Sequence, residues 1–279
     1  MTDPLDEIYQ YLDKATRYGR YITSLCPFHD ENRPSFFIYP DSYFCKSCGA
    51  KGKTKNLLDD LKKNQGTFIA KPQIDFHSPW SRWSKQYGDL PEIIKIAHRN
   101  LVDNNKTAYL SKRGIDVATT RKLKLGWLDD WITFPIYDPD GEIVGATARA
   151  GDTNRSQAKY CNYPGQSPDL LYVPDWSMVE LKDKIFLVYG IIDAISIYQL
   201  GYASLSTTTG KRTDPECLVH IRKRILIIPD HGEEVEASLL SAKLGWRGKA
   251  MKVDWPENTK DCNDLYLQHK DLLVSLLER

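Results

Sequence analysis

Long apolar runs are absent from this sequence. No stretch approaches the roughly 18 apolar residues that a membrane-spanning helix needs, and the first twenty residues lack the apolar core of a secretory signal peptide. An excess of one charge is also absent, since 38 Lys and Arg against 37 Asp and Glu leave a net charge of +1. We therefore expect a soluble, cytoplasmic protein with no membrane partner, in which any binding of polyanions depends on local basic patches.

Cysteine is scarce, and half of it falls in one motif. The sequence has six cysteines, and three of them join a histidine at the spacing Cys-x2-His-x15-Cys-x2-Cys. Two such pairs bring three thiolates and an imidazole to one ion, which predicts a closed, structural zinc site with no open position for a catalytic water. The predicted ligands are Cys26, His29, Cys45 and Cys48. The alternative is a set of unrelated cysteines and a surface histidine. The other cysteines show no pairing pattern and are expected to be reduced.

The residues around the motif predict a hairpin. In CPFHDENRPSFFIYPDSYFCKSCGAKG, a β-prone run over residues 35–38 is followed by a turn at residues 40–42 and a return through Tyr43 and Phe44. CPFH, the PSF strand and FCKSCGAKG resemble the zinc ribbon of DnaG-type bacterial and phage primases. The resemblance implies that the four ligands hold Zn²⁺ and that this domain contacts single-stranded template.

Composition divides the chain into four segments. We expect a zinc-binding ribbon domain over residues 1–62, which includes a short helix over residues 56–63. A linker is expected over residues 63–88, because Gly, Pro and lone aromatics follow one another there without a period. The linker aromatics either stack on bases or, as we favour, pack on a neighbouring domain; they are Phe76, Trp80, Trp83 and Tyr87. A basic α/β subdomain over residues 89–180 and a last domain over residues 181–279 complete the chain.

The basic subdomain carries a second block of similarity. Residues 132–137 and 142–148 are β-prone runs joined by Asp-Pro-Asp-Gly, which predicts a hairpin. AYLSKRGIDVATTRKLKLGW and ITFPIYDPDGEIVGATARA resemble the start of the DnaG polymerase core, and AKYCNYPGQSPDLLY resembles its KYLN element.

The resemblance implies a nucleic-acid-binding groove in this subdomain. It places Arg149, Lys159 and Asn162 against the template and the incoming nucleotide, with Lys112 and Arg113 near the same groove. Guanidinium and ammonium groups suit that role because they offset backbone phosphate charge. The alternative is that these are ordinary solvated charges.

The last third alternates strands and helices, which predicts a parallel sheet. Strands are expected at residues 185–189, 203–206, 225–228 and 250–255, and helices at residues 191–200, 235–244 and 265–277. This order, with GIIDAISIYQLGYASLSTTTG, IIPDHGEE and TKDCNDL, resembles the Toprim fold shared by DnaG primases and topoisomerases. The predicted fold class is α/β in a multidomain α+β chain: zinc ribbon, basic α/β subdomain and Toprim domain with a mainly parallel sheet.

The Toprim resemblance implies a site for two divalent cations, Mg²⁺ or Mn²⁺, held by carboxylates at the strand ends. The family places acids in EGxxD, Asp-x-Asp and KDPxD-like segments. This chain keeps four acids of that set, of which the first three are the predicted catalytic residues: Asp193, Asp230, Asp261 and Asp264. It departs at two positions, because Tyr189 replaces a Glu and Gly232 replaces an Asp. Glu233 or Glu234 could substitute, although acids are also common in the first turn of a helix.

The resemblance implies a DNA primase that makes short RNA primers on single-stranded DNA by metal-dependent nucleotidyl transfer. Its expected partners are the single-stranded DNA template, ribonucleoside triphosphates and a replicative helicase. Two alternatives stay open. The replaced acids allow a catalytically degenerate homologue that acts as a DNA-binding or replisome-assembly module. A Toprim topoisomerase or nuclease is less favoured because those enzymes lack the CPFH ribbon.

Overall fold

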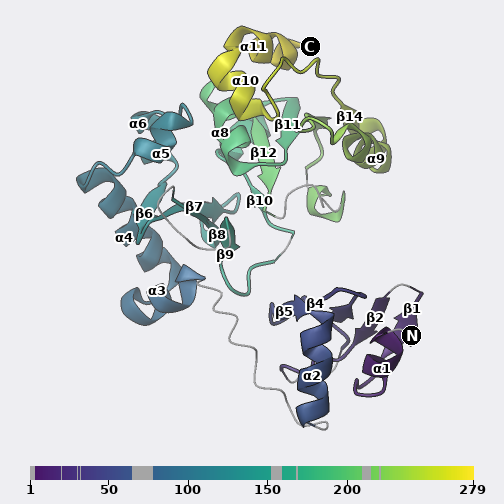
Figure 1. Ribbon diagram of the computed structural model, residues 1–279. Helices are drawn as coiled ribbons and strands as arrows, with labels where there is room; N and C mark the ends of the chain where they lie inside the picture. The colour runs from purple at the N-terminus through teal and green to yellow at the C-terminus, as the bar shows by residue number, and fades with distance from the viewer. Residues whose placement is uncertain are drawn as a thin grey trace. The chain divides into compact units, whose positions relative to one another are not determined.

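The computed structural model consists of two compact units, residues 1–76 and 77–279 (Figure 1). It describes residues 4–19, 21–29, 31, 33–64, 78–151, 159–167, 169–208, 215–219 and 221–279. Part of the predicted linker, residues 65–77 with Phe76, lies outside the described residues. No helix in the described ranges is both long and apolar enough to cross a membrane.

The first unit is built on a five-stranded antiparallel sheet in the order β1-β2-β3-β4-β5. Its elements are α1 (Pro4–Tyr9), β1 (Thr16–Tyr18), β2 (Tyr21–Ser24), β3 (Phe36–Ile38), β4 (Ser42–Cys45), β5 (Lys51–Lys53) and α2 (Thr54–Asn64). One face of the sheet is apolar, and its Ile22, Phe36 and Ile38 pack with Leu57 and Leu61 of α2. The predicted hairpin is confirmed as β3 and β4, and the predicted helix is confirmed as α2.

The second unit begins with helices that cover a four-stranded antiparallel sheet in the order β6-β7-β8-β9. These elements are α3 (Pro79–Tyr87), α4 (Leu90–Asp103), α5 (Ala108–Lys112), α6 (Val117–Lys122), β6 (Gly126–Leu128), β7 (Trp131–Tyr137), β8 (Ile143–Ala150) and β9 (Tyr160–Asn162). The predicted hairpin is confirmed as β7 and β8. Its turn is closed by a hydrogen bond from the amide of Gly141 to the carbonyl of Asp138, 3.1 Å long.

The linker interpretation is wrong for residues 79–87, which form α3. Trp80 and Trp83, three residues apart on one face of this helix, are fully buried, and their rings meet edge to face at 5.0 Å. They pack against Ala146 and Ala148 of β8. The Trp83 indole donates to a carboxylate oxygen of Asp129 at 2.8 Å. These two tryptophans are therefore packing residues, as we favoured, but they pack within their own unit and not on a neighbouring domain.

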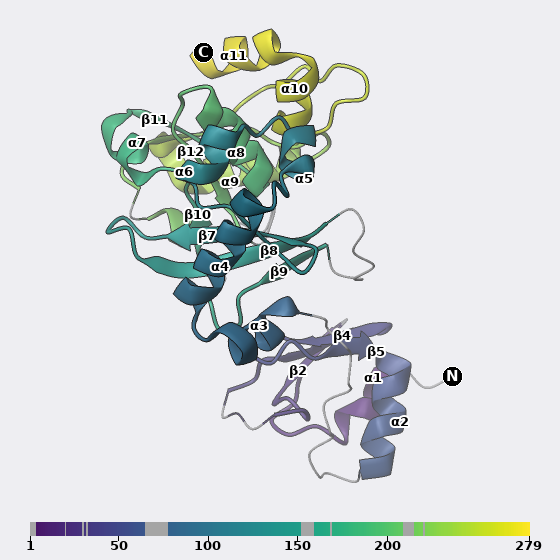
Figure 2. The same ribbon diagram turned by 90° about the vertical axis from the view of Figure 1, so that its left-hand side faces the viewer.

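The rest of the second unit is a five-stranded sheet in the order β10-β12-β11-β13-β14, parallel except for the edge strand β10. Its elements are β10 (Leu171–Tyr172), α7 (Trp176–Leu181), β11 (Lys184–Val188), α8 (Ile191–Gln199), β12 (Ser204–Thr207), η1 (Pro215–Leu218), β13 (Arg224–Ile227), α9 (Glu234–Leu244), η2 (Gly245–Arg247), β14 (Gly248–Ala250), α10 (Cys262–Gln268) and α11 (Lys270–Glu278). Helices lie on both faces: α8, α10 and α11 on one, α7 and α9 on the other. Figure 2 shows α8 and α10 side by side.

Two sequence predictions in this region need correction. The strand expected over residues 250–255 is β14, which ends at Ala250. The helix expected over residues 265–277 is two helices, α10 and α11, because His269 leaves the helical conformation at φ −141° and ψ 53°. The predicted alternation of strands and helices is confirmed, and β10 joins the sheet from residues ahead of the expected boundary at 181.

Burial of Trp80 makes a testable prediction about α3. Trp80→Ala should lower the free energy of unfolding of the second unit by about 3–5 kcal/mol, because it removes a fully buried aromatic side chain. Trp246→Ala is the matched control, since that indole is 81% exposed. Denaturant unfolding followed by circular dichroism measures both. Equal effects of the two substitutions would contradict the packing role of α3.

Candidate active site and metal centre

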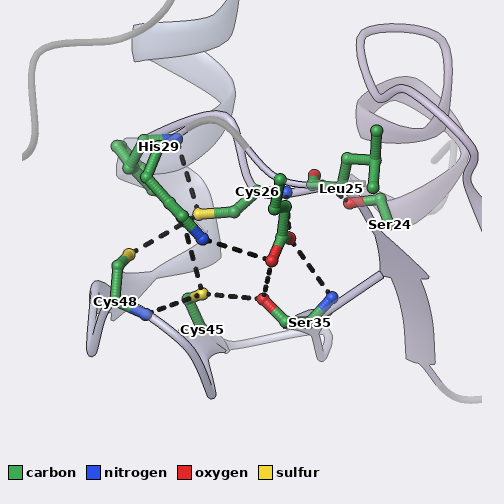
Figure 3. Close-up of polar contacts among 9 residues, drawn as sticks. Ser24, Leu25, Cys26, His29, Ser35, Cys45 and Cys48 are labelled. Atoms are coloured by element: carbon green, nitrogen blue, oxygen red, sulfur yellow. Dashed lines mark hydrogen bonds and ion pairs between the residues drawn. The ribbon is translucent and has the colours of Figure 1, made fainter. Parts of the chain in front are cut away.

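The four predicted zinc ligands converge in the first unit (Figure 3). Their ligand atoms all lie within 4.8 Å of one another. The sulfurs of Cys26 and Cys48 are 3.7 Å apart, close to the edge of about 3.8 Å in a tetrahedron with Zn–S bonds of about 2.3 Å. Nδ1 of His29 lies 4.0 Å from the sulfur of Cys45. Three thiolates and one imidazole thus form a closed donor set that suits a structural Zn²⁺.

Glu31 holds the zinc ligands in place, and sequence analysis did not identify it. One carboxylate oxygen lies 3.2 Å from Nε2 of His29, so the other ring nitrogen, Nδ1, faces the thiols. The same carboxylate accepts hydrogen bonds from the amide of Cys26 at 2.8 Å and the hydroxyl of Ser35 at 2.6 Å. Burial raises the pKa of Glu31, but these hydrogen bonds and His29 outweigh burial and keep the pKa below its ordinary value. A carboxylate behind a metal-binding histidine fixes the orientation of the ring.

A second feature missed from the sequence is a row of aromatic rings on the opposite face of the ribbon sheet, here called the aromatic platform. It consists of Tyr18, Tyr21, Phe37, Tyr39 and Phe44, whose neighbouring rings stack at centroid distances of 5.1–6.3 Å. The ammonium of Lys46 lies 4.5 Å from the centre of the Phe37 ring. The signal in the sequence was the alternation of these rings with the buried residues of β2, β3 and β4.

Carboxylates gather where the parallel strands end. Asp193 lies in the first turn of α8, directly after β11, and Asp230 follows β13. Asp261 caps α10 and accepts a hydrogen bond from the amide of Asp264 at 2.8 Å. Asp193 is only 6% exposed, and it accepts a hydrogen bond from the amide of Asn263 at 2.7 Å. This last contact ties the start of α8 to the start of α10.

Burial and mutual repulsion act on these acids together. Burial raises the pKa of Asp193 well above its ordinary value, and Asp261 and Asp230 raise it further. Burial, then Asp261 and Glu233, raises the pKa of Asp230 to about 7. Burial also raises the pKa of Asp261. A divalent cation bound among them would relieve this repulsion, and carboxylate oxygens are the donors that Mg²⁺ and Mn²⁺ prefer.

The acids are more widely spaced than the zinc ligands. Within the described ranges, no three carboxylates have ligand atoms that all lie within 4.8 Å of one another. The donor atoms therefore fit a magnesium or manganese site by chemistry and location.

Cations lie beside the acids. The pKa of Lys159 is lowered by burial and then by neighbouring cations, namely Arg149, Lys260 and Arg113, while Asp261 acts in the opposite direction. The side chain of Lys159 is exposed at the start of β9. Sequence analysis did not identify Lys260, which lies next to Asp261. Four cations and the acids of the strand ends thus share one region of the second unit.

The structure gives the other predicted binding residues distinct surroundings. Arg149 is only 8% exposed, and its guanidinium lies 3.9 Å above the ring of Tyr109. Arg113 donates to the side-chain oxygen of Asn263 at 3.1 Å, so it reaches the acids from α5. Asn162 accepts from the hydroxyl of Thr147 at 2.8 Å and donates to the carbonyl of Thr208 at 3.2 Å. Of Arg149, Lys159 and Asn162, only Lys159 is exposed.

Comparison with known proteins shows similarity to DNA primases. Residues 3–70 match the family model of the CHC2 zinc finger of DnaG. The chain is 27% identical over 263 residues to the DNA primase of Clostridium acetobutylicum, covering 71% of this chain and 43% of that protein. It is 23% identical to the DNA primase of Helicobacter pylori, covering 96% of this chain and 58% of that protein. The chain therefore spans about half the length of the curated relatives it matches.

Solved structures show the same fold. The zinc-binding and RNA polymerase domains of the Aquifex aeolicus primase match 98% of this chain and 83% of theirs, with a TM-score of 0.54 and 20% identity. The RNA polymerase domain of the Mycobacterium tuberculosis primase DnaG, in complex with double-stranded DNA, matches 67% of this chain and 77% of its own, with a TM-score of 0.56 and 17% identity. The predicted architecture, a zinc ribbon followed by a primase-like α/β core, is confirmed.

The zinc site leads to a testable prediction about folding of the first unit. Cys45→Ser should release the metal and loosen the first unit, because the binding free energy of a structural zinc contributes to folding. Metal analysis should find about one zinc per chain in the unaltered protein and far less in the variant. The second unit should keep its unfolding transition, since it has its own core. An unchanged zinc content would refute the assignment of these ligands.

Proposed function

We propose that this chain, which is related to DnaG-type DNA primases in both of its units, synthesises short RNA primers on single-stranded DNA. The observation that carries the proposal is the meeting of buried acids with cations at the carboxyl ends of the parallel strands. In such sheets this edge is where ligands bind. The acids suit metal ions, and the cations suit phosphates and a template backbone.

The acids have the role of holding divalent cations. Asp193, Asp230 and Asp261, with Asp264, are the residues that would hold Mg²⁺ or Mn²⁺. Such ions, when bound, offset the charge on the reacting phosphate and favour ionisation of the attacking hydroxyl. The chain's own contribution is to keep the carboxylates oriented before the ion arrives, through amide donors at the start of α10.

The cations have the role of binding phosphate. Lys159 and Lys260 present ammonium groups beside the acids, where the triphosphate of an incoming ribonucleotide would carry its negative charge. Arg149 is held rigid by Tyr109 and by a hydrogen bond to the carbonyl of Ala150. We expect Arg149 to attract phosphate through the electrostatic field of its positive charge, which these contacts hold at a fixed position. Recruitment by a replicative helicase and a cytoplasmic location remain predictions.

The aromatic platform is the proposed contact of the ribbon with single-stranded template. Bases stack on exposed aromatic rings with little dependence on sequence, each stack contributing about 1–3 kcal/mol. Lys46, above the Phe37 ring, and Lys51, opposite Phe44 on β5, supply positive charge along the same face. Rings and ammonium groups together form a surface suited to unpaired nucleic acid.

The second candidate function is a degenerate homologue that binds template without polymerising. The observation in its favour is that Tyr189 and Gly232 stand where carboxylates are expected. Both candidate functions include template binding on the aromatic platform. They differ only in whether the acids at the strand ends support catalysis. Primer synthesis by the unaltered protein separates them.

Asp230 provides the test of catalysis. Asp230→Asn should abolish incorporation of labelled ribonucleotides on single-stranded DNA in the presence of Mn²⁺, because it removes a carboxylate at the centre of the acid group. Asp254→Asn is the control, since that carboxylate is exposed and lies outside the group. Products that persist in Asp230→Asn would contradict the metal role. A silent unaltered protein that still binds template would favour the second candidate.

Phe37 provides the test of template binding. Phe37→Ala should weaken single-stranded DNA binding about 5- to 150-fold, the equivalent of one lost base stack of about 1–3 kcal/mol. Fluorescence anisotropy measures the affinity, and metal analysis checks that zinc is retained. Tyr11→Ala is the matched control because Tyr11 is an exposed aromatic of the same unit that lies off the platform. Equal affinities of the two variants would show that the platform does not bind DNA.

A further inference from the structure

The turn between β13 and α9 carries an acid at each end, Asp230 and Glu233. The amide of Glu233 donates to the carbonyl of Asp230 at 2.9 Å, which closes a four-residue turn. Gly232, the third residue of this turn, has a φ of +86°. A positive φ at that position is the property of a type II turn and favours glycine. The position where the family has an acid is thus occupied by a turn glycine, and the next residue carries a carboxylate.

Tyr189 directly follows β11, the strand that pairs with β13 ahead of the same turn. It lies in the buried cluster that contains Ala237 and Leu240 of α9, and only 7% of the residue is exposed. Its hydroxyl is buried and has no hydrogen-bond partner among the residues that the structure describes, an arrangement that costs about 1–3 kcal/mol when no partner is supplied. Burial, followed by the charges of Glu233 and Asp230, raises the pKa of Tyr189 to about 12. The phenol is therefore a neutral donor on the side of the sheet that α9 covers.

We propose that Asp230 and Glu233 together hold a divalent cation, Mg²⁺ or Mn²⁺, and that the Tyr189 hydroxyl donates a hydrogen bond to the Glu233 carboxylate that binds the ion. The inference deepens the proposed function and rests on it. Glu233 supplies the carboxylate that Gly232 lacks. Tyr189, which cannot be a good ligand itself, becomes a positioning residue for that carboxylate.

The neighbouring acid of the same turn does not compete for this role. The carboxylate of Glu234 accepts a hydrogen bond from the amide of Gly232 at 3.1 Å and is exposed to solvent. Charge alone would favour either acid at the start of a helix, because the amino end of the helix dipole is positive. Glu234 therefore serves as a control for every effect of Glu233 that comes from the helix and not from the ion.

Manganese binding tests the proposal without relying on catalysis. The zinc-loaded full chain is titrated with Mn²⁺, and free Mn²⁺ is measured by electron paramagnetic resonance for the unaltered protein and for E233Q, E234Q, Y189F and D230N. We expect E233Q to bind Mn²⁺ at least about 10-fold more weakly, and Y189F about 10-fold more weakly, as is typical when a ligand or its hydrogen-bond partner is lost. We expect E234Q to bind as the unaltered protein does. Thermal unfolding should be similar for E233Q and E234Q, since both remove one acid from the start of α9.

The outcomes separate this inference from the proposed function. If E233Q and E234Q bind Mn²⁺ equally while D230N loses it, Glu233 is not a ligand, and the proposed function stands. If E233Q loses affinity but Y189F does not, the role of Tyr189 is refuted. If the unaltered protein binds no Mn²⁺, both the inference and the metal-dependent function fail together.

Discussion

Asn263 is the residue on which the geometry of the strand ends depends. Its amide donates to the buried carboxylate of Asp193, and its side chain donates to the carbonyl of Arg113 and the hydroxyl of Ser196 while accepting from the Arg113 guanidinium. Only 1% of Asn263 is exposed. A buried carboxylate without such donors would carry a large desolvation cost. One residue, through its backbone amide and its side chain, thereby fixes α5, α8 and α10 around an acid group whose members repel one another, and it does so before any ion is bound.

In the zinc ribbon, a polar residue with several hydrogen-bond partners also positions functional groups, and there the physical requirement is the stability of a small unit. A unit of about this size buries too little apolar surface to be very stable alone, so metal ligation supplements its core. Glu31 connects the ligands to the sheet by accepting from Cys26 and Ser35 while facing His29. In both units, a polar residue with several partners sets the position of chemically active groups. One face of the ribbon sheet carries the core and the zinc ligands. The aromatic platform therefore occupies the other face.

Much of this arrangement was predictable because its signals are local. The zinc ligands follow from spacing, the β3–β4 and β7–β8 hairpins from turn residues, and the alternating fold from apolar runs. The parts that sequence analysis missed depend on contacts between distant segments. The pairing of Trp83 with Asp129, the approach of Lys260 to Lys159 and the link from Asn263 to Asp193 join residues that no local pattern relates. The linker error arose in the same way, since α3 packs its two tryptophans on a sheet formed by residues much later in the chain.

The two departures from the expected acid set are physically connected. Gly232 adopts a φ that an L-residue rarely takes, although no atom lies within 4 Å of the place its Cβ would occupy. An aspartate there would have room but would strain the backbone, so the turn favours glycine at this position. With the turn in place, α9 begins one residue after Glu233, and its inner face presents Ala237 to Tyr189. A glutamate at position 189 would bury a second charge against apolar α9 side chains, whereas a phenol buries a neutral donor there. Tyrosine at 189 and glycine at 232 are therefore compatible with each other, and both suit the proposed placement of the metal-binding carboxylate on Glu233, the last residue of the turn.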